Sequence, residues 1–401
     1  MTIMVFVRVG SRYESADING ASHFIEHLMF KGTKRRPKTI NISQELDRYG
    51  AEYNAMTSKD LTCYYVKIDA KQTPLAIDLL HDMLFHSHYD PAEIDRERGV
   101  IVEEINMYED NPRMHIEDLL ERVLYPDSTL GWDIAGPREV IRSVSREKLI
   151  AYRDAYYTPS RLSVVIAGSI HPKTKQLLEK TFGSVHKPAK KEDKPFVPFV
   201  APKKQLAPVV AYQEKNTEQV QMSMAFRGFG VNDKRIPAAQ LLGTILGGTM
   251  SSRLFIEVRE RRGLCYSVSA SHQSYEDVGV FQVSSGLEKN RVQEAVKVIW
   301  KELQKIAREG VDADELRRAK DHVRGKIALA LEDSSAQADW YGRQWVFQKT
   351  LQTPEERLKR IERVTSKDIQ AVAKTLFTKK NMAAAVIGPC GTQKDVEALF
   401  V

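Results

Sequence analysis

The chain has 401 residues, of which 42% are hydrophobic and 28% charged, and its formal net charge is +7. These proportions are ordinary for a soluble globular protein with room for two domains, and no apolar run approaches the length of about 18 residues that a membrane-spanning helix needs. Basic residues are dense only at 34–36 and 187–194, without interleaved aromatic residues, so we expect no nucleic-acid partner. Three widely separated cysteines predict free thiols and a reducing, cytoplasmic compartment.

The first marked feature follows an N-terminal segment, residues 1–8, that reads as a strand and not as a signal peptide. His23 and His27 are four residues apart, so on a helix they lie on one face, with Glu26 within a turn of the first. This His-x-x-Glu-His pattern is the inverted form of a zinc-binding motif and predicts two metal ligands with a base beside them. On the pentapeptide alone, an ordinary amphipathic helix with two histidines stays open as the alternative.

A second helix offers a third ligand, which a zinc ion held by two histidines requires. Asp90, Pro91 and Glu93 predict the start of this helix, expected over 90–109. Glu97 and Glu104 are seven residues apart and therefore share one of its faces. A solvated acidic face is the alternative. The other elements expected in the first half are helices at 42–49, 72–87, 114–124, 146–156 and 171–182, and strands at 53–56, 61–68 and 162–167.

The second half repeats the first. Asp90-Pro-Ala-Glu-Ile94 is echoed by Asp312-Ala-Asp-Glu-Leu316, and the matching positions elsewhere lie about 213 to 222 residues apart. We therefore expect an N-terminal metal-binding domain at 1–185, a proline- and lysine-rich linker at 186–204, and a homologous domain at 205–401. The predicted fold is α+β, with two homologous domains that each consist of an antiparallel sheet covered by helices.

Two differences between the halves follow from this repeat. The positions that match Glu97 and Glu104 are Ala319 and Lys326, and no second His-x-x-Glu-His exists, so only the first half can hold the metal. The second half also begins with one more strand than the first, so we expect an unpaired sheet edge in the first half.

The combination of His23, Glu26, His27, Glu97 and Glu104 at these spacings resembles the pitrilysin and insulysin family of zinc peptidases, which includes the mitochondrial processing peptidases. The resemblance covers nearly the whole chain. It implies one Zn²⁺ per chain held by His23, His27 and Glu104, with Glu26 activating water and Glu97 orienting a ligand histidine. It also implies the two-domain fold of the processing peptidases.

The same resemblance extends to residues that would handle the substrate. Arg259 and Tyr266 match an arginine and a tyrosine that the C-terminal halves of this family contribute as donors to the substrate backbone and the oxyanion. The strand with Asn54, Ala55 and Met56 resembles the edge strand on which a peptide pairs. Structural alternatives stay open here: an ion pair of Arg259 with a neighbouring glutamate, a half-buried Tyr266, and an ordinary strand.

The sequence thus predicts a zinc endopeptidase that cleaves unfolded peptides. Shorter members of the family act as dimers, so we expect a homodimer, with a heterodimer left open. Two other classes remain as alternatives. One is a non-catalytic subunit, against which the intact metal motif argues, and the other is a subunit that is active only with a different partner chain.

Overall fold

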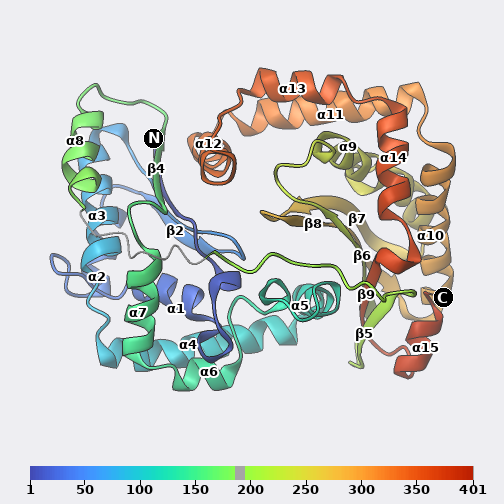
Figure 1. The fold of residues 1–401 in the computed structure, drawn as a ribbon, viewed down its shortest axis with the longest axis horizontal. Helices are drawn as coiled ribbons and strands as arrows, with labels where there is room; N and C mark the ends of the chain where they lie inside the picture. The colour runs from blue at the N-terminus through green and yellow to red at the C-terminus, as the bar shows by residue number, and fades with distance from the viewer. Residues whose placement is uncertain (186–194, 401) are drawn as a thin grey trace. The chain divides into compact units, whose positions relative to one another are not determined.

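The structure is a computed structural model that describes residues 1–185 and 195–400. Contacts divide the chain into two units (Figure 1), each described below by itself. The first unit comprises Met1–Asn106, Trp132–Val197 and Leu329–Leu351, and the second comprises Met107–Gly131, Pro198–Ala328 and Gln352–Val401. Of the linker that the sequence predicts, residues 186–194 lie outside the described part of the chain.

The first unit is built on a four-stranded antiparallel sheet. In the order β2-β3-β1-β4, its strands are β2 (Glu52–Thr57), β3 (Thr62–Lys67), β1 (Thr2–Val7) and β4 (Leu162–Ala167). The predicted strand at 162–167 agrees with β4 residue for residue, and the others agree to within one or two residues. The central strand β1 is buried along its whole length because both of its faces are covered.

One face of this sheet carries the main core of the first unit. Ile3, Val5 and Val7 of β1 point into it and pack against helices from the same half of the chain. The helices of the first unit are α1 (Ala21–Leu28), α2 (Thr39–Asp47), α3 (Thr73–His86), α4 (Pro91–Asp110, whose last four residues belong to the second unit), α6 (Arg138–Ser143), α7 (Arg146–Tyr156) and α8 (Thr174–Thr181). Each helix predicted for this region is present, with bounds shifted by no more than three residues.

The second unit repeats this design with one strand more. Its sheet has the order β5-β9-β6-β8-β7, with β5 (Val209–Gln213), β9 (Met382–Ile387), β6 (Gln219–Phe229), β8 (Val278–Glu288) and β7 (Cys265–Ser274). All neighbours are antiparallel except β5 and β9, which are parallel. Its helices include α9 (Ile236–Gly247), α10 (Val292–Glu309), α11 (Ala313–Ala330), α13 (Pro354–Glu362), α14 (Ser366–Leu376) and α15 (Gln393–Ala398).

The order β2-β3-β1-β4 recurs in the second unit as β7-β8-β6-β9, so the duplication seen in the sequence is also a duplication of topology. The predicted fold class is confirmed. The strand β5 has no counterpart among the described residues of the first unit, whose sheet ends at β4.

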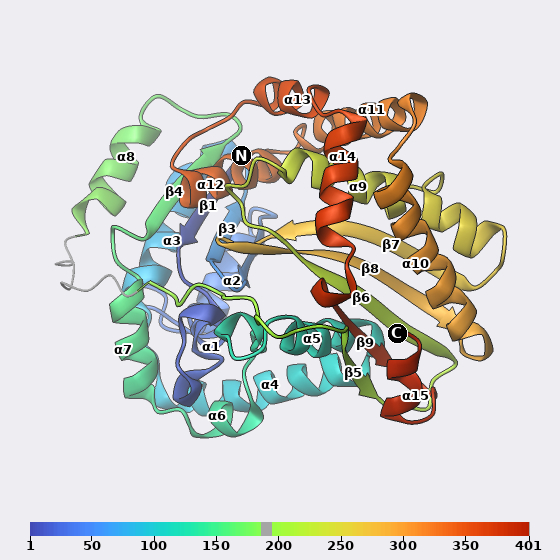
Figure 2. The same cartoon turned by 45° about the vertical axis from the view of Figure 1, so that its right-hand side comes forward.

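The two halves of the sequence exchange one equivalent helix, so each compact unit contains a helix from the other half. The second face of the first sheet, with Met4 and Phe6, is covered by α12 (Ser334–Gln348), which comes from the second half of the chain. The matching face of the second sheet, with Ala383 and Ala385, is covered by α5 (Pro112–Leu124), which comes from the first half. Figure 2 shows α12 beside β1 and β4, and α5 beside β5 and β9.

The starts of α5 and α12 are 222 residues apart, which is the repeat offset, so the exchange is reciprocal. The compact units therefore differ from the linear domains expected at 1–185 and 205–401 by these two helices. A repeat in the sequence shows which segments correspond, but it does not show on which copy a segment packs. No helix in the described part of the chain is long and apolar enough to span a membrane.

Candidate metal centre

Helix α1 presents the His-x-x-Glu-His motif, and a buried carboxylate fixes its first turn. Gly20 takes the N-cap position with a φ of 98°, in the left-handed region that glycine tolerates, and it has no side chain to cap the helix. Glu14 does this instead, because its carboxylate accepts the N–H groups of Gly20 and Ser22, both at 2.7 Å. The start of the helix is therefore fixed at Ala21, two residues before His23.

Helix α4 supplies the carboxylates opposite α1. It begins as predicted, with Pro91 in its first turn and the Asp90 carboxylate accepting the N–H of Ala92 at 2.8 Å. Glu97 and Glu104 share a face, and this face is turned toward the histidines of α1. Glu97 is only 1% exposed, so the alternative of a solvated acidic face does not hold for this pair.

Three side chains converge on one point. The distance from His23 Nε2 to His27 Nε2 is 3.2 Å, and the Oε2 atom of Glu104 lies 3.5 Å from the first and 3.4 Å from the second. Ligand atoms of a tetrahedral zinc site, with bonds of about 2.0–2.2 Å, lie about 3.3–3.6 Å apart. Two imidazole nitrogens and one carboxylate oxygen are also a common donor set of catalytic zinc. The residues present therefore fit a zinc ion. They form the one cluster of potential metal ligands in the described part of the chain.

The charges around this point also favour a cation. Burial and the adjacent imidazole of His27 lower the pKa of His23, so His23 stays neutral with a free lone pair. Burial acts in the same direction on His27, but hydrogen bonds with Glu104 and Glu97 outweigh it and raise the pKa of His27 to about 9. The protein groups alone thus hold one positive charge between two carboxylates, at the place where a metal ion would replace a proton.

Glu97 contacts His27 from the side remote from the other donors. Its Oε2 atom lies 3.1 Å from His27 Nδ1, and its Oε1 atom forms an ion pair of 2.6 Å with Lys31 Nζ. Burial alone would raise the pKa of Glu97, but the hydrogen bonds with His27 and Lys31 outweigh it and lower this pKa, so Glu97 stays ionised. This is the arrangement by which a carboxylate orients a ligand histidine.

Glu26, the predicted base, lies beside the potential metal ligands on α1. Burial raises its pKa, and a hydrogen bond from the hydroxyl of Thr57 partly offsets this rise. A carboxylate with a pKa above its ordinary value accepts protons more readily near neutral pH. Thr57 is the last residue of β2, so this hydrogen bond ties the base to the end of the edge strand.

The predicted substrate strand is the edge strand β2, which contains Asn54, Ala55 and Met56. Ala55 is nearly buried, and its N–H donates to the side-chain oxygen of Asn54 at 2.9 Å. One outward main-chain donor of this strand is therefore engaged by its own neighbour.

Arg259 and Tyr266 belong to the second unit, where they lie next to each other. Arg259 is in a short π-helix (Phe255–Glu260), and Tyr266 is in β7 and 73% exposed. The guanidinium carbon of Arg259 lies 5.1 Å from the centre of the Tyr266 ring. The Nε atom of Arg259 lies 3.8 Å from the Oε1 atom of Glu260. An exposed phenol is not the half-buried strand residue of the alternative interpretation, whereas the contact with Glu260 leaves the ion-pair alternative for Arg259 in place.

Comparisons with known proteins agree with this site. Residues 1–138 match the family model described as insulinase, peptidase family M16, and residues 143–323 match the model of the peptidase M16 inactive domain. An uncharacterized zinc protease of Bacillus subtilis, YmxG, is 36% identical over 98% of this chain and 93% of its own length. The chain belongs to the M16 peptidase family. An uncharacterized zinc protease of Streptomyces coelicolor is 35% identical over 97% of the chain and 84% of its own length.

Solved structures show the same M16 fold. A protease from Helicobacter pylori superimposes with a TM-score of 0.89 at 23% identity, and the match covers 97% of this chain and 93% of that one. The second M16 model is called inactive in its description, and this agrees with the loss of ligands in the repeat: Ala319 and Lys326 occupy α11 where Glu97 and Glu104 occupy α4.

Three residues near the site escaped the sequence reasoning: Glu14, Lys31 and Thr57. Lys31 follows His27 by four residues but lies beyond the end of α1 at Leu28, so helical periodicity does not place it. Glu14 and Thr57 reach the site from a loop and a strand end, and no local pattern marks such residues.

Proposed function

We propose that this chain is a zinc-dependent endopeptidase that hydrolyses peptide bonds in unfolded peptides. The triangle of donor atoms on His23, His27 and Glu104, with Glu26 one residue from His27 on the same helix, supports this proposal most directly. The names of the relatives as zinc proteases support it at the level of the family.

In this proposal His23, His27 and Glu104 would hold one zinc ion per chain. When bound, zinc supplies a Lewis acid that acidifies water and polarises a carbonyl. Glu26 accepts the proton of the attacking water and delivers it to the leaving amine, and its raised pKa suits both steps. Thr57 holds the Glu26 carboxylate in place, and Glu97 orients His27.

We assign substrate handling to residues that the family resemblance suggests. Tyr266 would donate to the oxygen on which negative charge develops, and Arg259 would hold the peptide backbone. The exposure of Tyr266 is compatible with this role. Replacing Tyr266 with Phe should lower kcat about 10²- to 10³-fold and leave zinc content unchanged, whereas unchanged kcat would remove Tyr266 from the mechanism.

The peptide would add to the open edge of β2 at residues 54–56, which would explain a broad sequence tolerance. For this the Asn54 side chain must release the N–H of Ala55. Binding of an unstructured peptide should therefore slow hydrogen exchange at Ala55, and unchanged exchange there would place the substrate elsewhere.

We further propose that the chain acts as a homodimer in the cytoplasm. The dimer rests on the resemblance to short family members. The free Cys63, Cys265 and Cys390 thiols agree with a reducing compartment. A light-scattering mass of one chain at micromolar concentration would argue against the dimer.

The experiment that tests the function is cleavage of a quenched, unstructured peptide by the purified chain. We expect turnover that a chelator abolishes and added zinc restores. Restored zinc without turnover, followed by activity only when another chain is added, would favour the partner-dependent alternative.

A further inference from the structure

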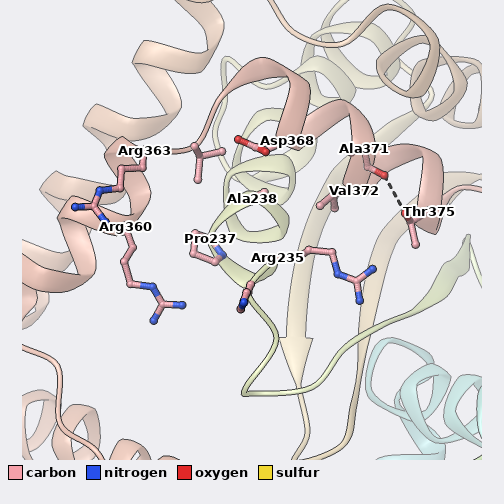
Figure 3. Close-up of a pocket in the computed structure, with 11 residues that line it drawn as sticks. Arg235, Pro237, Ala238, Arg360, Arg363, Asp368, Ala371, Val372 and Thr375 are labelled. Carbon is pink, nitrogen blue, oxygen red and sulfur yellow. Dashed lines mark hydrogen bonds between the residues drawn. The ribbon is translucent and has the colours of Figure 1, made fainter.

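The second unit contains a cavity of about 470 Å³ that none of the proposed catalytic residues lines. It lies between the start of α9, the end of α13 and the helix α14 (Figure 3). Pro237, Ala238, Val364 and Val372 give it an apolar floor of buried residues. Its size falls within the range of about 300–1,000 Å³ that is typical of small-molecule sites.

The rim of this cavity is strongly cationic. Lys234, Arg235, Arg360 and Arg363 line it, against a single carboxylate, Asp368. Formal charges therefore leave an excess of three positive charges among the lining residues.

The one carboxylate is already engaged. Asp368 is the capping acid of α14, and its Oδ2 atom accepts the N–H and the hydroxyl of Thr365 at 2.8 and 2.7 Å. These hydrogen bonds lower the pKa of Asp368, so it stays ionised and bound to its own helix. It forms no ion pair with the rim arginines among the described residues.

Two arginines of α13 donate hydrogen bonds to amide oxygens and not to carboxylates. Arg360 donates to Gln352 Oε1 at 3.0 Å, and Arg357, one turn earlier, donates to Gln240 Oε1 at 2.9 Å. Burial and the neighbouring charge of Arg360 lower the pKa of Arg357 to about 10. No side-chain ion pair or hydrogen bond of Arg363 is found in the described part of the chain. In Figure 3 the side chains of Arg360 and Arg363 both stand on the α13 side of the cavity.

The charge of Arg235 is balanced by Asp233, whereas the end of a helix adds to the positive field. Arg235 is bound to Asp233 through two hydrogen bonds of 2.9 and 2.6 Å, so its orientation is set within its own loop. It is also the N-cap of α9, and the positive end of the twelve-residue α9 dipole therefore lies at the cavity.

We infer that this cavity binds a small organic phosphate with two or more negative charges, its phosphate on Arg360 and Arg363 and its organic part on the apolar floor. Planar guanidinium groups bind phosphate oxygens in pairs, and two of them here lack a carboxylate partner. The limited volume and the apolar floor favour a small molecule over an extended acidic peptide. A nucleoside diphosphate has the required combination of charge and apolar surface.

The test measures binding of adenosine diphosphate by isothermal titration calorimetry at 150 mM salt. Inorganic pyrophosphate, which carries the phosphate groups without an organic part, is measured beside it. The double variant Arg360→Gln/Arg363→Gln removes the two guanidiniums that lack a carboxylate partner. The double variant Lys367→Gln/Lys374→Gln removes two exposed charges of α14 that do not line the cavity, and it serves as the matched control.

We expect the wild type and the lysine control to bind adenosine diphosphate equally, and the arginine variant at least tenfold more weakly, since each charge-assisted hydrogen bond is worth about that factor. Equal binding by all three proteins would overturn the inference. Equal binding is also the result expected if the phosphates only chelated zinc, because chelation does not depend on these arginines. Binding of a hexaglutamate peptide alone would overturn it in favour of an acidic peptide. Peptide cleavage by the arginine variant should match that of the wild type, which also shows that the variant is folded.

Discussion

Replacing Glu97 with Gln should weaken zinc binding about 10- to 100-fold. Glutamine has the shape of glutamate but lacks its charge. In the wild type the Glu97 carboxylate lies 3.1 Å from His27 Nδ1 and 2.6 Å from Lys31 Nζ. Loss of a carboxylate that orients a ligand histidine typically costs this factor, which corresponds to about 1.4–2.7 kcal/mol. The effect should be near the upper end, because His23 Nδ1 has no such partner in the described part of the chain and cannot compensate.

The assay is competition for zinc against a chromophoric chelator, with the melting temperature of the zinc-free proteins as a check on folding. Glu103→Gln is the matched control. It removes the same charge from the same helix, next to the proposed ligand Glu104, but its side chain is exposed and accepts a long hydrogen bond of 3.4 Å from Asn106. We expect the control to bind zinc like the wild type. Equal affinities of the Glu97 and Glu103 variants would refute the role of Glu97 in orienting His27.

Three further predictions concern residues around the site and the sheet below it. Thr57→Val should shift the acidic limb of the kcat/KM profile to higher pH, since the base loses a donor that favours its ionised form, whereas Thr57→Ser should keep the wild-type profile. Burial raises the pKa of Glu14 from 4.5 to about 7, outweighing its hydrogen bonds. The folded state then binds this proton more tightly than the unfolded state, so its contribution to the free energy of unfolding falls by about 3 kcal/mol as pH rises from about 4.5 to 7. Urea unfolding across that range should show this slope in the wild type and lose it in Glu14→Gln; identical slopes would disprove the assignment. A Cβ atom on Gly342 of α12 would lie 2.1 Å from the Phe6 ring, so Gly342→Ala should destabilise the fold by about 1–3 kcal/mol, whereas Gly99→Ala in open space on α4 should stabilise it slightly. Equal melting temperatures of these two variants would contradict the packing of α12 on β1.

The sequence predicts the parts of the site that lie on regular helices. His23 and His27 on one helix, and Glu97 and Glu104 on another, follow from the 3.6-residue period, and the structure brings the two faces together. The spacing alone could not show that the two helices are adjacent, and the family resemblance supplied that step.

Two features lay beyond sequence reasoning for physical reasons. The exchange of α5 and α12 depends on tertiary packing, because either sheet offers an apolar face on which these helices could pack. The cap that Glu14 gives to α1 depends on a loop that brings it back to Gly20, and loops of this kind have no periodic signal. The ion pair of Lys31 with Glu97 joins a residue beyond the end of α1 to α4, and no helical spacing indicates such a contact.

The most direct test of the account is zinc content measured by elemental analysis beside peptide cleavage, on the wild type and on Glu26→Gln. The variant keeps the three donor atoms and removes only the proposed base. The account predicts about one zinc per chain in both proteins and turnover in the wild type alone. Absence of zinc from the wild type, after exposure to zinc, would contradict the central claim.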